Sequence, residues 1–354
     1  MKGTQKLKEI GQSLWLDNIT RGMLNDGTLE SYVSDFSVTG LTSNPSIFDR
    51  AIGQSEDYDD SIREAIGRGV KGEDLFFELA IQDLQRAADL FRPAYDRTDR
   101  VDGWASLEVS PLLAYDTDST IKEVAALHER ARRDNLYIKI PGTAQGARAI
   151  EESIFAGLPI NVTLLFSHEQ YLVAADAFMR GIERRIQAGL DPSVPSVASV
   201  FISRWDKAVA GVVSDRLRDR LGIAVAKLAY AAYRKLLDSD RWLRLANAGA
   251  RPQRLLWAST GTKDPEAPDV LYVEALAAPF TINTIPDKVL KAFDEHGTVG
   301  ELMPTDGGDA EEVLAEFAKA GIDRLALAER LQRDGAGTFD ESWRSLLASI
   351  DGKI

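Results

Sequence analysis

A single lysine within an apolar run is the feature of this sequence that most favours chemistry. Lys139 lies between Ile138 and Ile140 in residues 135–143, a short run that ends in Pro-Gly-Thr. Because successive side chains of a strand point to opposite faces, Lys139 would face away from the two isoleucines. Both faces are normally apolar when helices cover a parallel sheet. Burial would disfavour the charged ammonium there and leave a nucleophilic amine.

A lysine in a strand also has an ordinary structural explanation. An edge strand can carry an exposed lysine, and a lysine with a buried stem can still hold its ammonium in water. Fully buried lysines are rare unless they are paired or have a task. The residue types in the other apolar runs decide between these interpretations.

Polar side chains follow the same alternation in four other apolar runs. Their neighbours of opposite parity are apolar and include Leu107, Val162 and Leu164, which we expect to face surrounding helices. In a closed barrel the other face points to the interior, so the polar residues would converge near the carboxyl ends of the strands, where barrel active sites lie. The residues predicted to point inward are Trp15, Asp17, Ser106, Glu108, Ser110, Asn161, Thr163, Ser199, Phe201 and Ser203.

A buried lysine with two carboxylates suits Schiff-base formation with a carbonyl substrate. Attack of the amine gives a carbinolamine, which needs an acid to lose water. The resulting iminium accepts the electrons of a breaking carbon–carbon bond, and this step needs a base at the substrate hydroxyl. Asp17 and Glu108 would divide these two roles.

The alternative is a cluster that serves structure alone. Asp17 and Glu108 would then pair with Lys139, and side chains such as Asn161 and Thr163 would satisfy backbone groups. Burying charges without compensation is costly. The shared parity and the strand-end positions therefore favour the catalytic interpretation.

Eight apolar runs alternate along the chain with segments of helical spacing. This alternation predicts a parallel sheet, and eight units favour an α/β fold of the (β/α)8 TIM-barrel type over a doubly wound sheet. The expected strands are residues 13–17, 37–44, 105–109, 135–143, 159–166, 197–202, 254–259 and 280–285. The clearest expected helices are residues 74–91, 120–132, 144–155, 167–186 and 224–237.

Composition narrows the classes of function. The chain has 354 residues, 44% of them hydrophobic and 27% charged, which is typical of a globular protein. It has no cysteine and only three widely spaced histidines, so we expect neither a metal nor a cofactor. A net charge of −13 disfavours nucleic acid as a partner. The N-terminus lacks the apolar core of a signal peptide and no stretch reaches membrane-spanning length, so we expect a cytoplasmic protein with no membrane partner.

Five segments resemble those of transaldolases and occur in the order of that family. They are residues 41–48 (LTSNPSIF), 106–109 (SLEV), 137–141 (YIKIP), 161–167 (NVTLLFS) and 199–204 (SVFISR). The resemblance runs from about Gln12 to His296, and the later segments are most similar to a longer bacterial subgroup. It implies a Schiff-base-forming enzyme that acts on small sugar phosphates as a monomer or a homodimer.

The resemblance also implies roles for individual residues. Lys139 would form the Schiff base with the C2 carbonyl of the ketose. Glu108 would act through a water held by Thr163, and Asp17 would handle the hydroxyl proton next to the cleaved bond. Arg204 would bind the substrate phosphate, which suits the charge and donor fork of a guanidinium. Asn44 and Ser199 would hold the hydroxyls of the dihydroxyacetone unit, and the pocket would be lined by Asn161 and Phe201.

The sequence departs from the family pattern after the seventh expected strand. Family members often carry a Ser-Phe-Arg-Asn run there, whereas this chain has residues 259–264 (STGTKD). We expect Ser259 and Lys263 to replace the serine and the arginine, because barrel phosphate sites commonly use the loops after strands seven and eight. Lys263 would otherwise be an ordinary solvated loop lysine.

The implied activity is that of a transaldolase in the non-oxidative pentose phosphate pathway. Such an enzyme transfers a dihydroxyacetone unit from sedoheptulose 7-phosphate or fructose 6-phosphate to glyceraldehyde 3-phosphate or erythrose 4-phosphate. One alternative is an enzyme similar to fructose 6-phosphate aldolases, which release free dihydroxyacetone but are shorter and carry glutamine where this chain has Glu108. Another is a barrel that binds a sugar phosphate without chemistry, because a fold does not fix a function.

The C-terminal region is expected to be helical. We find no linker, so we expect a single domain over residues 1–354, with residues 304–354 as a helical extension packed on the barrel. A helix should start at Asp309, whose side chain we expect to cap it, and helices should fill the rest to about Ile350. The amphipathic stretch 339–347 could, by the same resemblance, also lie over the barrel mouth and shape substrate access.

Overall fold

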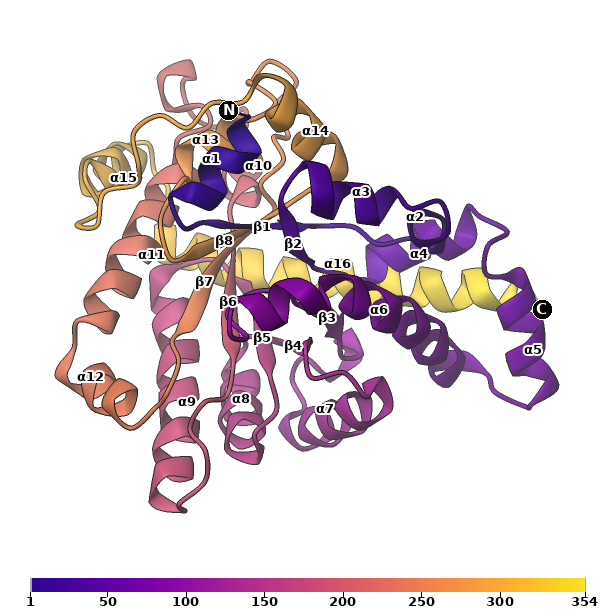
Figure 1. Ribbon diagram of the computed structural model, residues 1–354. Coiled ribbons are helices and arrows are strands. Elements are labelled where there is room, and N and C mark those ends of the chain that lie inside the picture. Colours follow the sequence, from indigo (N-terminus) through magenta and orange to yellow (C-terminus); the bar gives the residue numbers. More distant parts are fainter. Residues whose placement is uncertain (1, 354) are drawn as a thin grey trace.

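The structure is a computed structural model that describes residues 2–353, and its centre is a barrel of eight parallel strands (Figure 1). The strands are β1 (Ser13–Leu16), β2 (Val38–Leu41), β3 (Ala105–Glu108), β4 (Leu136–Pro141), β5 (Ile160–Leu165), β6 (Ser196–Phe201), β7 (Gln253–Ala258) and β8 (Thr281–Ile285). Their order is β2-β1-β8-β7-β6-β5-β4-β3. The two ends of this order meet where the Leu41 amide donates to the Trp104 carbonyl at 2.9 Å. The predicted TIM barrel and its eight strands are confirmed.

Helices surround the barrel, and all five helical segments expected from the sequence form, as α6, α7, α8, α9 and α11. Side-chain caps fix the start of several. The Thr143 hydroxyl accepts from the Gly146 amide at 3.0 Å where α8 begins. The helices are α1 (Gly3–Glu9), α2 (Arg21–Asn25), α3 (Thr28–Asp35), α4 (Pro45–Gly53), α5 (Asp59–Gly67), α6 (Gly72–Arg97), α7 (Thr117–Ala131), α8 (Ala144–Ala156), α9 (His168–Gln187), α10 (Ser203–Val209), α11 (Leu221–Leu237), α12 (Asp240–Asn247), α13 (Leu271–Ala275), α14 (Asp287–His296), α15 (Ala310–Lys319) and α16 (Arg324–Asp351).

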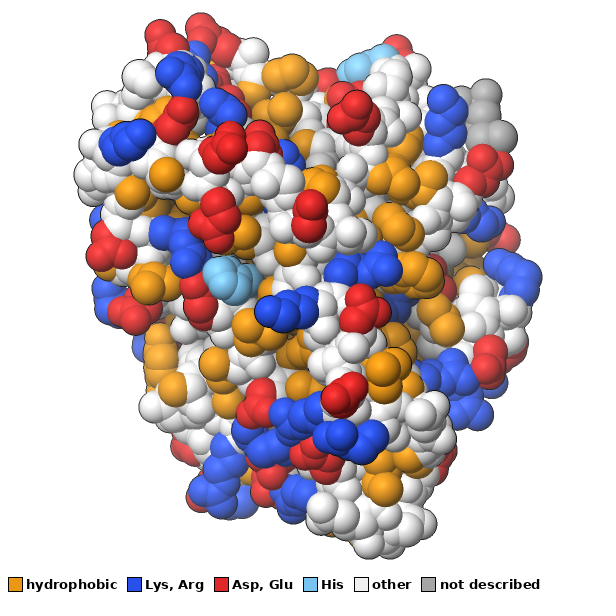
Figure 2. Space-filling model, turned by 90° about the vertical axis from the view of Figure 1, so that its left-hand side faces the viewer, with side chains coloured by type: hydrophobic (Ala, Val, Ile, Leu, Met, Phe, Trp, Pro, Cys, Tyr) orange, Lys and Arg blue, Asp and Glu red, His pale blue; other side chains and the backbone are white. Residues whose placement is uncertain are grey.

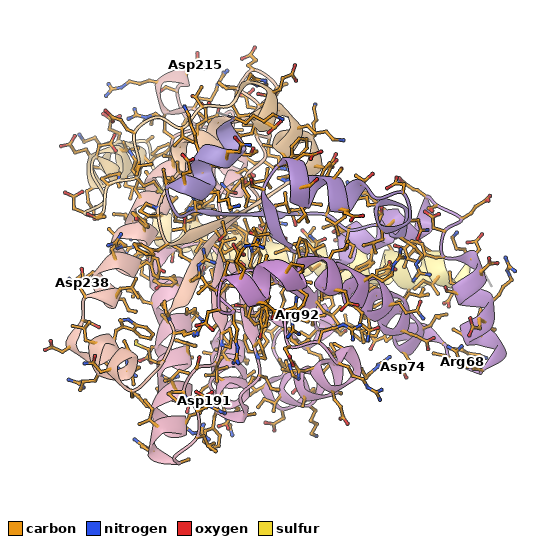
Figure 3. All side chains as sticks on the ribbon, viewed as in Figure 1. Arg68, Asp74, Arg92, Asp191, Asp215 and Asp238 are labelled. Atoms are coloured by element: carbon orange, nitrogen blue, oxygen red, sulfur yellow. The ribbon has the colours of Figure 1, made fainter. Side chains whose placement is uncertain are left out.

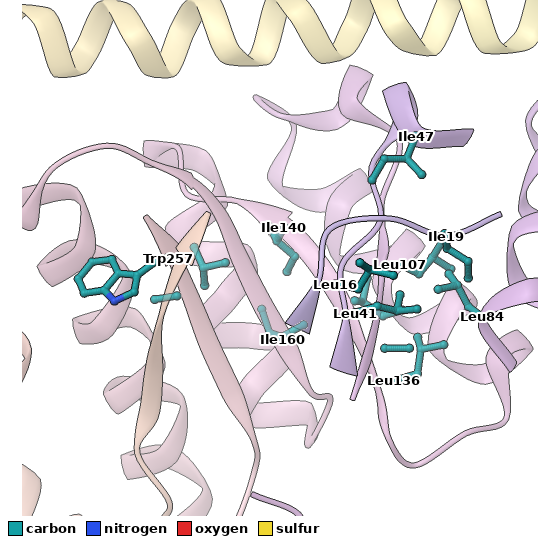
Figure 4. Packing of buried hydrophobic residues seen from close by; sticks show 14 of the residues in the cluster. Leu16, Ile19, Leu41, Ile47, Leu84, Leu107, Leu136, Ile140, Ile160 and Trp257 are labelled. Atoms are coloured by element: carbon teal, nitrogen blue, oxygen red, sulfur yellow. The ribbon is translucent and has the colours of Figure 1, made fainter. Parts of the chain in front are cut away.

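Alternation along the strands divides the core into two layers. The outer layer lies between barrel and helices and includes Leu107 and Ile140, both labelled in Figure 4. The inner layer is aromatic: the rings of Trp104 and Tyr137 stack 4.1 Å apart, and the ring of Trp15 lies 6.1 Å from Tyr137. Since Tyr137 precedes Lys139 by two residues on the same face of β4, this aromatic layer fills the barrel beneath the lysine.

Gly40 allows the barrel to close between β2 and β3. It forms an isolated parallel bridge with Trp104. A Cβ atom on this residue would lie 2.6 Å from the Trp104 carbonyl oxygen and 2.7 Å from the Trp15 indole. A larger residue would therefore push the two strands apart.

The start of α15 differs from the expectation in one respect. The helix begins after Asp309, as predicted, but the Asp309 side chain makes no capping hydrogen bond. Its backbone has φ −82° and ψ 6°, whereas a capping residue normally has an extended backbone that turns its side chain toward the free amides. The carboxylate instead pairs with Lys227 on α11 at 2.5 Å.

The last helix, α16, is the yellow helix of Figure 1 and packs along α4. Residues 339–347, predicted to be amphipathic, lie within it. Trp343 on its buried face meets Phe76 edge to face at 4.9 Å, and its indole donates to Glu73 on α6 at 2.9 Å. The extension is therefore anchored both by aromatic packing and by a hydrogen bond.

Charged side chains of both signs are interspersed over the face of the molecule shown in Figure 2. Several lie at the outer ends of helices, such as Arg68, Asp74 and Asp238 in Figure 3. Exposed ion pairs such as Arg68–Glu64, at 2.8 Å, contribute little to stability because water screens them, so the two core layers dominate stability. Every helix within residues 2–353 is too short or too polar to cross a bilayer.

Replacement of Gly40 by valine should lower the free energy of unfolding by about 1–3 kcal/mol, because the added atoms overlap the closing strand. Chemical denaturation followed by fluorescence measures the change. The matched control is Gly67→Ala, since a Cβ atom on Gly67 at the end of α5 meets nothing within 4 Å. This control should leave stability unchanged or raise it. Equal stability of Gly40→Val and the native chain would contradict the closure argument.

Candidate active site

The amine of Lys139 is held inside the barrel by two acceptors. The lysine side chain is 5% exposed, and its Nζ donates to Glu108 Oε2 and to the Ser43 carbonyl, both at 2.9 Å. Glu108 lies directly opposite Lys139 in the pairing of β3 with β4. The register of the sheet thus brings acid and amine together, as the shared parity predicts.

Burial raises the pKa of both carboxyls near the amine. For Glu108, burial is opposed by the charge and the hydrogen bond of Lys139. For Asp17, which follows β1, burial is opposed by the charge of Lys139 and by a hydrogen bond from Thr42 at 2.9 Å. The Thr42 hydroxyl also lies 2.7 Å from that of Thr284. A raised pKa moves each carboxyl toward the range in which it can both give and take a proton.

Amide and hydroxyl groups continue the site onto β5 and β6. The Asn161 amide donates to Ser106 Oγ at 3.2 Å, and Ser199 Oγ donates to Asn161 Oδ1 at 2.7 Å. Asn44 caps α4, where its Oδ1 accepts from the Ile47 amide at 3.1 Å. These bonds fix the orientation of each amide at the mouth of the barrel.

Two buried oxygens near the lysine have no hydrogen-bond partner among the described residues. They are Thr163 Oγ1 and Glu108 Oε1. Unpaired polar atoms in a dry interior are costly, and they concentrate at functional sites. Both atoms can therefore receive a water molecule or a substrate group.

A β-bulge makes the expected position of Leu164 wrong. Between Val162 and Leu165, β5 has one residue more than β6. Leu164 takes a φ of 59° and joins the inner layer, and Leu165 takes its place in the outer layer. Strict alternation fails here because the extra residue of a bulge shifts all later side chains by one position.

Ser110 and Ser203 were also expected to point inward, but both follow the ends of their strands, where alternation no longer applies. The Ser110 hydroxyl donates to Glu73 on α6 at 3.4 Å, and the Ser110 amide donates to Glu123 on α7 at 2.6 Å. Ser203 begins α10, and its hydroxyl lies 2.9 Å from that of Ser259.

Cations gather on one side of the site. Burial lowers the pKa of Arg204, while the charges of Asp17 and Glu108 oppose this shift. The Arg204 guanidinium lies 5.1 Å from the Phe201 ring and 5.8 Å from the Phe339 ring. Burial and the charge of Arg204 lower the pKa of Lys263. Cations that disfavour one another in this way are a suitable receptor for an anion.

These groups surround a cavity of 660 Å³ at the carboxyl ends of the strands. Nine of the predicted site residues line it, and Glu108 and Asn161 lie one hydrogen bond behind the lining. The lining ones are Asp17, Asn44, Lys139, Thr163, Ser199, Phe201, Arg204, Ser259 and Lys263.

Sequence reasoning missed several residues that line the same cavity. Arg50 and Lys207 add two cations, and Thr42 and Thr284 add hydroxyls. Arg50 and Lys207 lie on helices after the strands, beyond the reach of strand alternation, although Lys207 follows Arg204 by one helical turn. Helix α16 contributes Leu331, Asp334, Gly335, Thr338 and Phe339.

Within residues 2–353, no group of three His, Asp or Glu side chains is arranged to hold a metal ion.

Comparison with known proteins agrees with this geometry. Residues 14–350 match the family model described as Transaldolase/Fructose-6-phosphate aldolase. A transaldolase of Parafrankia sp. is 44% identical over 99% of this chain and 97% of its own length. A transaldolase of Thermobifida fusca is 43% identical over 98% of this chain and 96% of its own length. A protein of Nostoc sp. named Transaldolase 2 is 37% identical over 99% and 97% respectively. The chain belongs to the transaldolase family, and transaldolase activity is the function that this membership supports.

Proposed function

We propose that the chain transfers a dihydroxyacetone unit between sugar phosphates through a Schiff base on Lys139. The donor is sedoheptulose 7-phosphate or fructose 6-phosphate, and the acceptor is glyceraldehyde 3-phosphate or erythrose 4-phosphate, as in the non-oxidative pentose phosphate pathway. The observation that best supports this proposal is the contact of 2.9 Å between the buried Lys139 amine and Glu108. Lys139 lines a cavity that is also lined by arginine and lysine side chains.

The reaction begins at the lysine. Its hydrogen bond to Glu108 provides a path for the ammonium proton, and the neutral amine then adds to the C2 carbonyl of the ketose. The carbinolamine loses its hydroxyl as water, with the proton supplied by Glu108 through a water on Thr163. The free Thr163 Oγ1 and Glu108 Oε1 support this role.

The C3–C4 bond of the ketose is cleaved next. Asp17 takes the proton of the C4 hydroxyl, the C3–C4 electron pair moves into the iminium, and the aldose phosphate leaves. The enamine that remains then attacks the aldehyde of the acceptor, and the same carboxyl returns the proton. Water then hydrolyses the new iminium, which releases the ketose phosphate and frees the Lys139 amine. The raised pKa of Asp17 supports this role, because the carboxyl has to alternate between its protonated and its deprotonated form.

Recognition of the substrate divides between two sides of the cavity. Asn44, Ser199 and Asn161 hold the hydroxyls of the transferred unit, and Phe201 forms part of the wall. Arg204, Ser259 and Lys263 bind the phosphate. Guanidinium and ammonium groups bind phosphate through charge-assisted hydrogen bonds, which supports this division.

Glu108 favours transfer over release of free dihydroxyacetone. By resemblance, fructose 6-phosphate aldolases carry glutamine at this position. An assay with and without an aldose phosphate separates the two reactions, because an aldolase consumes fructose 6-phosphate without any acceptor.

We further propose that residues 304–354 belong to the same domain as the barrel, since α16 lines the cavity. The cytoplasmic location and the monomeric or homodimeric state stay predictions.

Borohydride should trap the ketose phosphate covalently on Lys139, because it reduces the iminium to a stable amine. Mass spectrometry of peptides locates the adduct. Lys139→Met should abolish both trapping and turnover while circular dichroism stays native. The matched control is Lys207→Met, which removes another lysine of the same cavity and should still be trapped. Turnover by folded Lys139→Met would refute the proposal.

Asp17→Asn should abolish activity yet stabilise the fold as pH rises. The folded protein raises the pKa of Asp17, so the native chain loses stability as pH increases from the ordinary value of 3.8 through the raised one. Asparagine avoids this loss. Thermal melts measure this across pH. The melting temperatures of the two proteins should coincide in acid, and that of the variant should be the higher one as pH rises. Asp26→Asn is the control of opposite sign, because hydrogen bonds that Thr28 donates to the Asp26 carboxylate lower its pKa. A parallel pH dependence of native protein and Asp17→Asn would contradict the burial argument.

Arg204→Ala should raise KM for fructose 6-phosphate roughly 10- to 100-fold, the usual effect of losing a charged hydrogen-bond donor. Steady-state kinetics measures the change. Unphosphorylated fructose serves as the control substrate, since its KM should hardly differ between native and variant enzymes. An equal rise for both sugars would show that Arg204 does not contact the phosphate.

A further inference from the structure

One glutamine of the C-terminal helix links the ends of two strands that carry the site. Gln332 lies on α16, and its amide nitrogen donates to the carbonyls of Gly142 and Leu164, each at 3.0 Å. Gly142 directly follows β4, the strand of Lys139. A single side-chain amide thus uses both of its protons on the catalytic half of the barrel.

These contacts hold the backbone that directly follows the Cα atom of Thr163. The Gly142 amide donates to the Thr163 carbonyl at 2.7 Å, and the carbonyl of the next residue, Leu164, accepts from Gln332. Gly142 and Gln332 therefore hold two consecutive carbonyls, those of Thr163 and Leu164. The Thr163 side chain, on the residue that supplies the first of these carbonyls, is buried, and its hydroxyl has no hydrogen-bond partner among the described residues.

The β5 bulge explains why an external donor is needed here. The extra residue of a bulge falls out of the regular ladder, so its carbonyl must find a partner elsewhere. Leu164, with φ at 59°, is in a conformation that costs a residue of its type free energy. The Gln332 amide offers the partner that holds Leu164 in this state.

The path of α16 permits the contact. A Cβ atom on Gly335 would lie 3.0 Å from the Leu164 side chain and 3.2 Å from Arg204. Glycine at this position therefore lets the helix approach the bulge closely enough for Gln332, almost one turn earlier, to reach both carbonyls. Figure 4 shows this helix running across the barrel above the strands.

We propose that Gln332 is a positioning residue, which fixes the β5 bulge and through it the Thr163 hydroxyl that serves Schiff-base chemistry. It touches no reacting atom in this role. The inference rests on the proposed function, because its effect is measured on the Lys139 adduct. It gives the extension a part in the chemical step that acts through the backbone of β5, beyond forming a wall of the cavity.

The test measures how fast Lys139 becomes trapped after the enzyme meets fructose 6-phosphate, by quenching with borohydride at successive times. Gln332→Leu removes both donors at similar size and should slow trapping and kcat about 10-fold, the loss expected for such hydrogen bonds, with KM within about 2-fold. Gln332→Glu keeps the shape but removes the amide donor, so at pH 8 it should slow trapping at least as much.

Ser349→Ala is the matched control. Ser349 lies on the same helix, is partly buried and donates to Asp49 on α4 at 3.0 Å, away from β4 and β5. It should lower stability slightly and leave trapping at the native rate. Native trapping rates in both Gln332 variants, or equal slowing in Ser349→Ala, would overturn the proposal. Turnover by Lys139→Met would overturn the proposed function itself, whatever Gln332 does.

Discussion

The ion pair of Lys139 and Glu108 is the constraint on which the rest of the structure depends. An amine and a carboxyl in a nearly dry interior, 2.9 Å apart, are tolerable only if neighbouring groups compensate their lost hydration. The parallel register of β3 and β4 puts the two residues opposite one another, and the Ser43 carbonyl adds a second acceptor. The aromatic layer below fills the barrel, and the charge of Arg204 opposes the rise that burial causes in the pKa of Glu108. The same arrangement that costs stability keeps the amine near its proton acceptor.

Much of this was accessible from the sequence because strands have a period of two. That period and the alternation with helices were enough to predict eight strands and the inward set that includes Asp17, Glu108 and Lys139. The prediction failed at Leu164 because a bulge inserts one residue, and neither a leucine nor its neighbours signal this. It failed at Asp309 because a long-range partner, Lys227, determined the use of that carboxylate.

The extension was harder to interpret for a different reason. Its amphipathic pattern indicates a helix, but pattern alone does not say which face of the barrel the helix covers. The structure answers this through specific contacts: Trp343 docks on α6, and Gln332 reaches the ends of β4 and β5. Polar side chains such as Gln332 leave no periodic signal, so only tertiary structure could reveal that one of them bridges two backbones.

The aromatic layer has a kinetic consequence. Trp15, Trp104 and Tyr137 plug the barrel below the lysine, so the cavity has its entrance at the strand ends. A departing aldose and an incoming one would then pass through this same entrance. In the proposed reaction both aldoses would occupy the same position in front of Lys139, so the first product would leave before the second substrate binds, which is a double-displacement order.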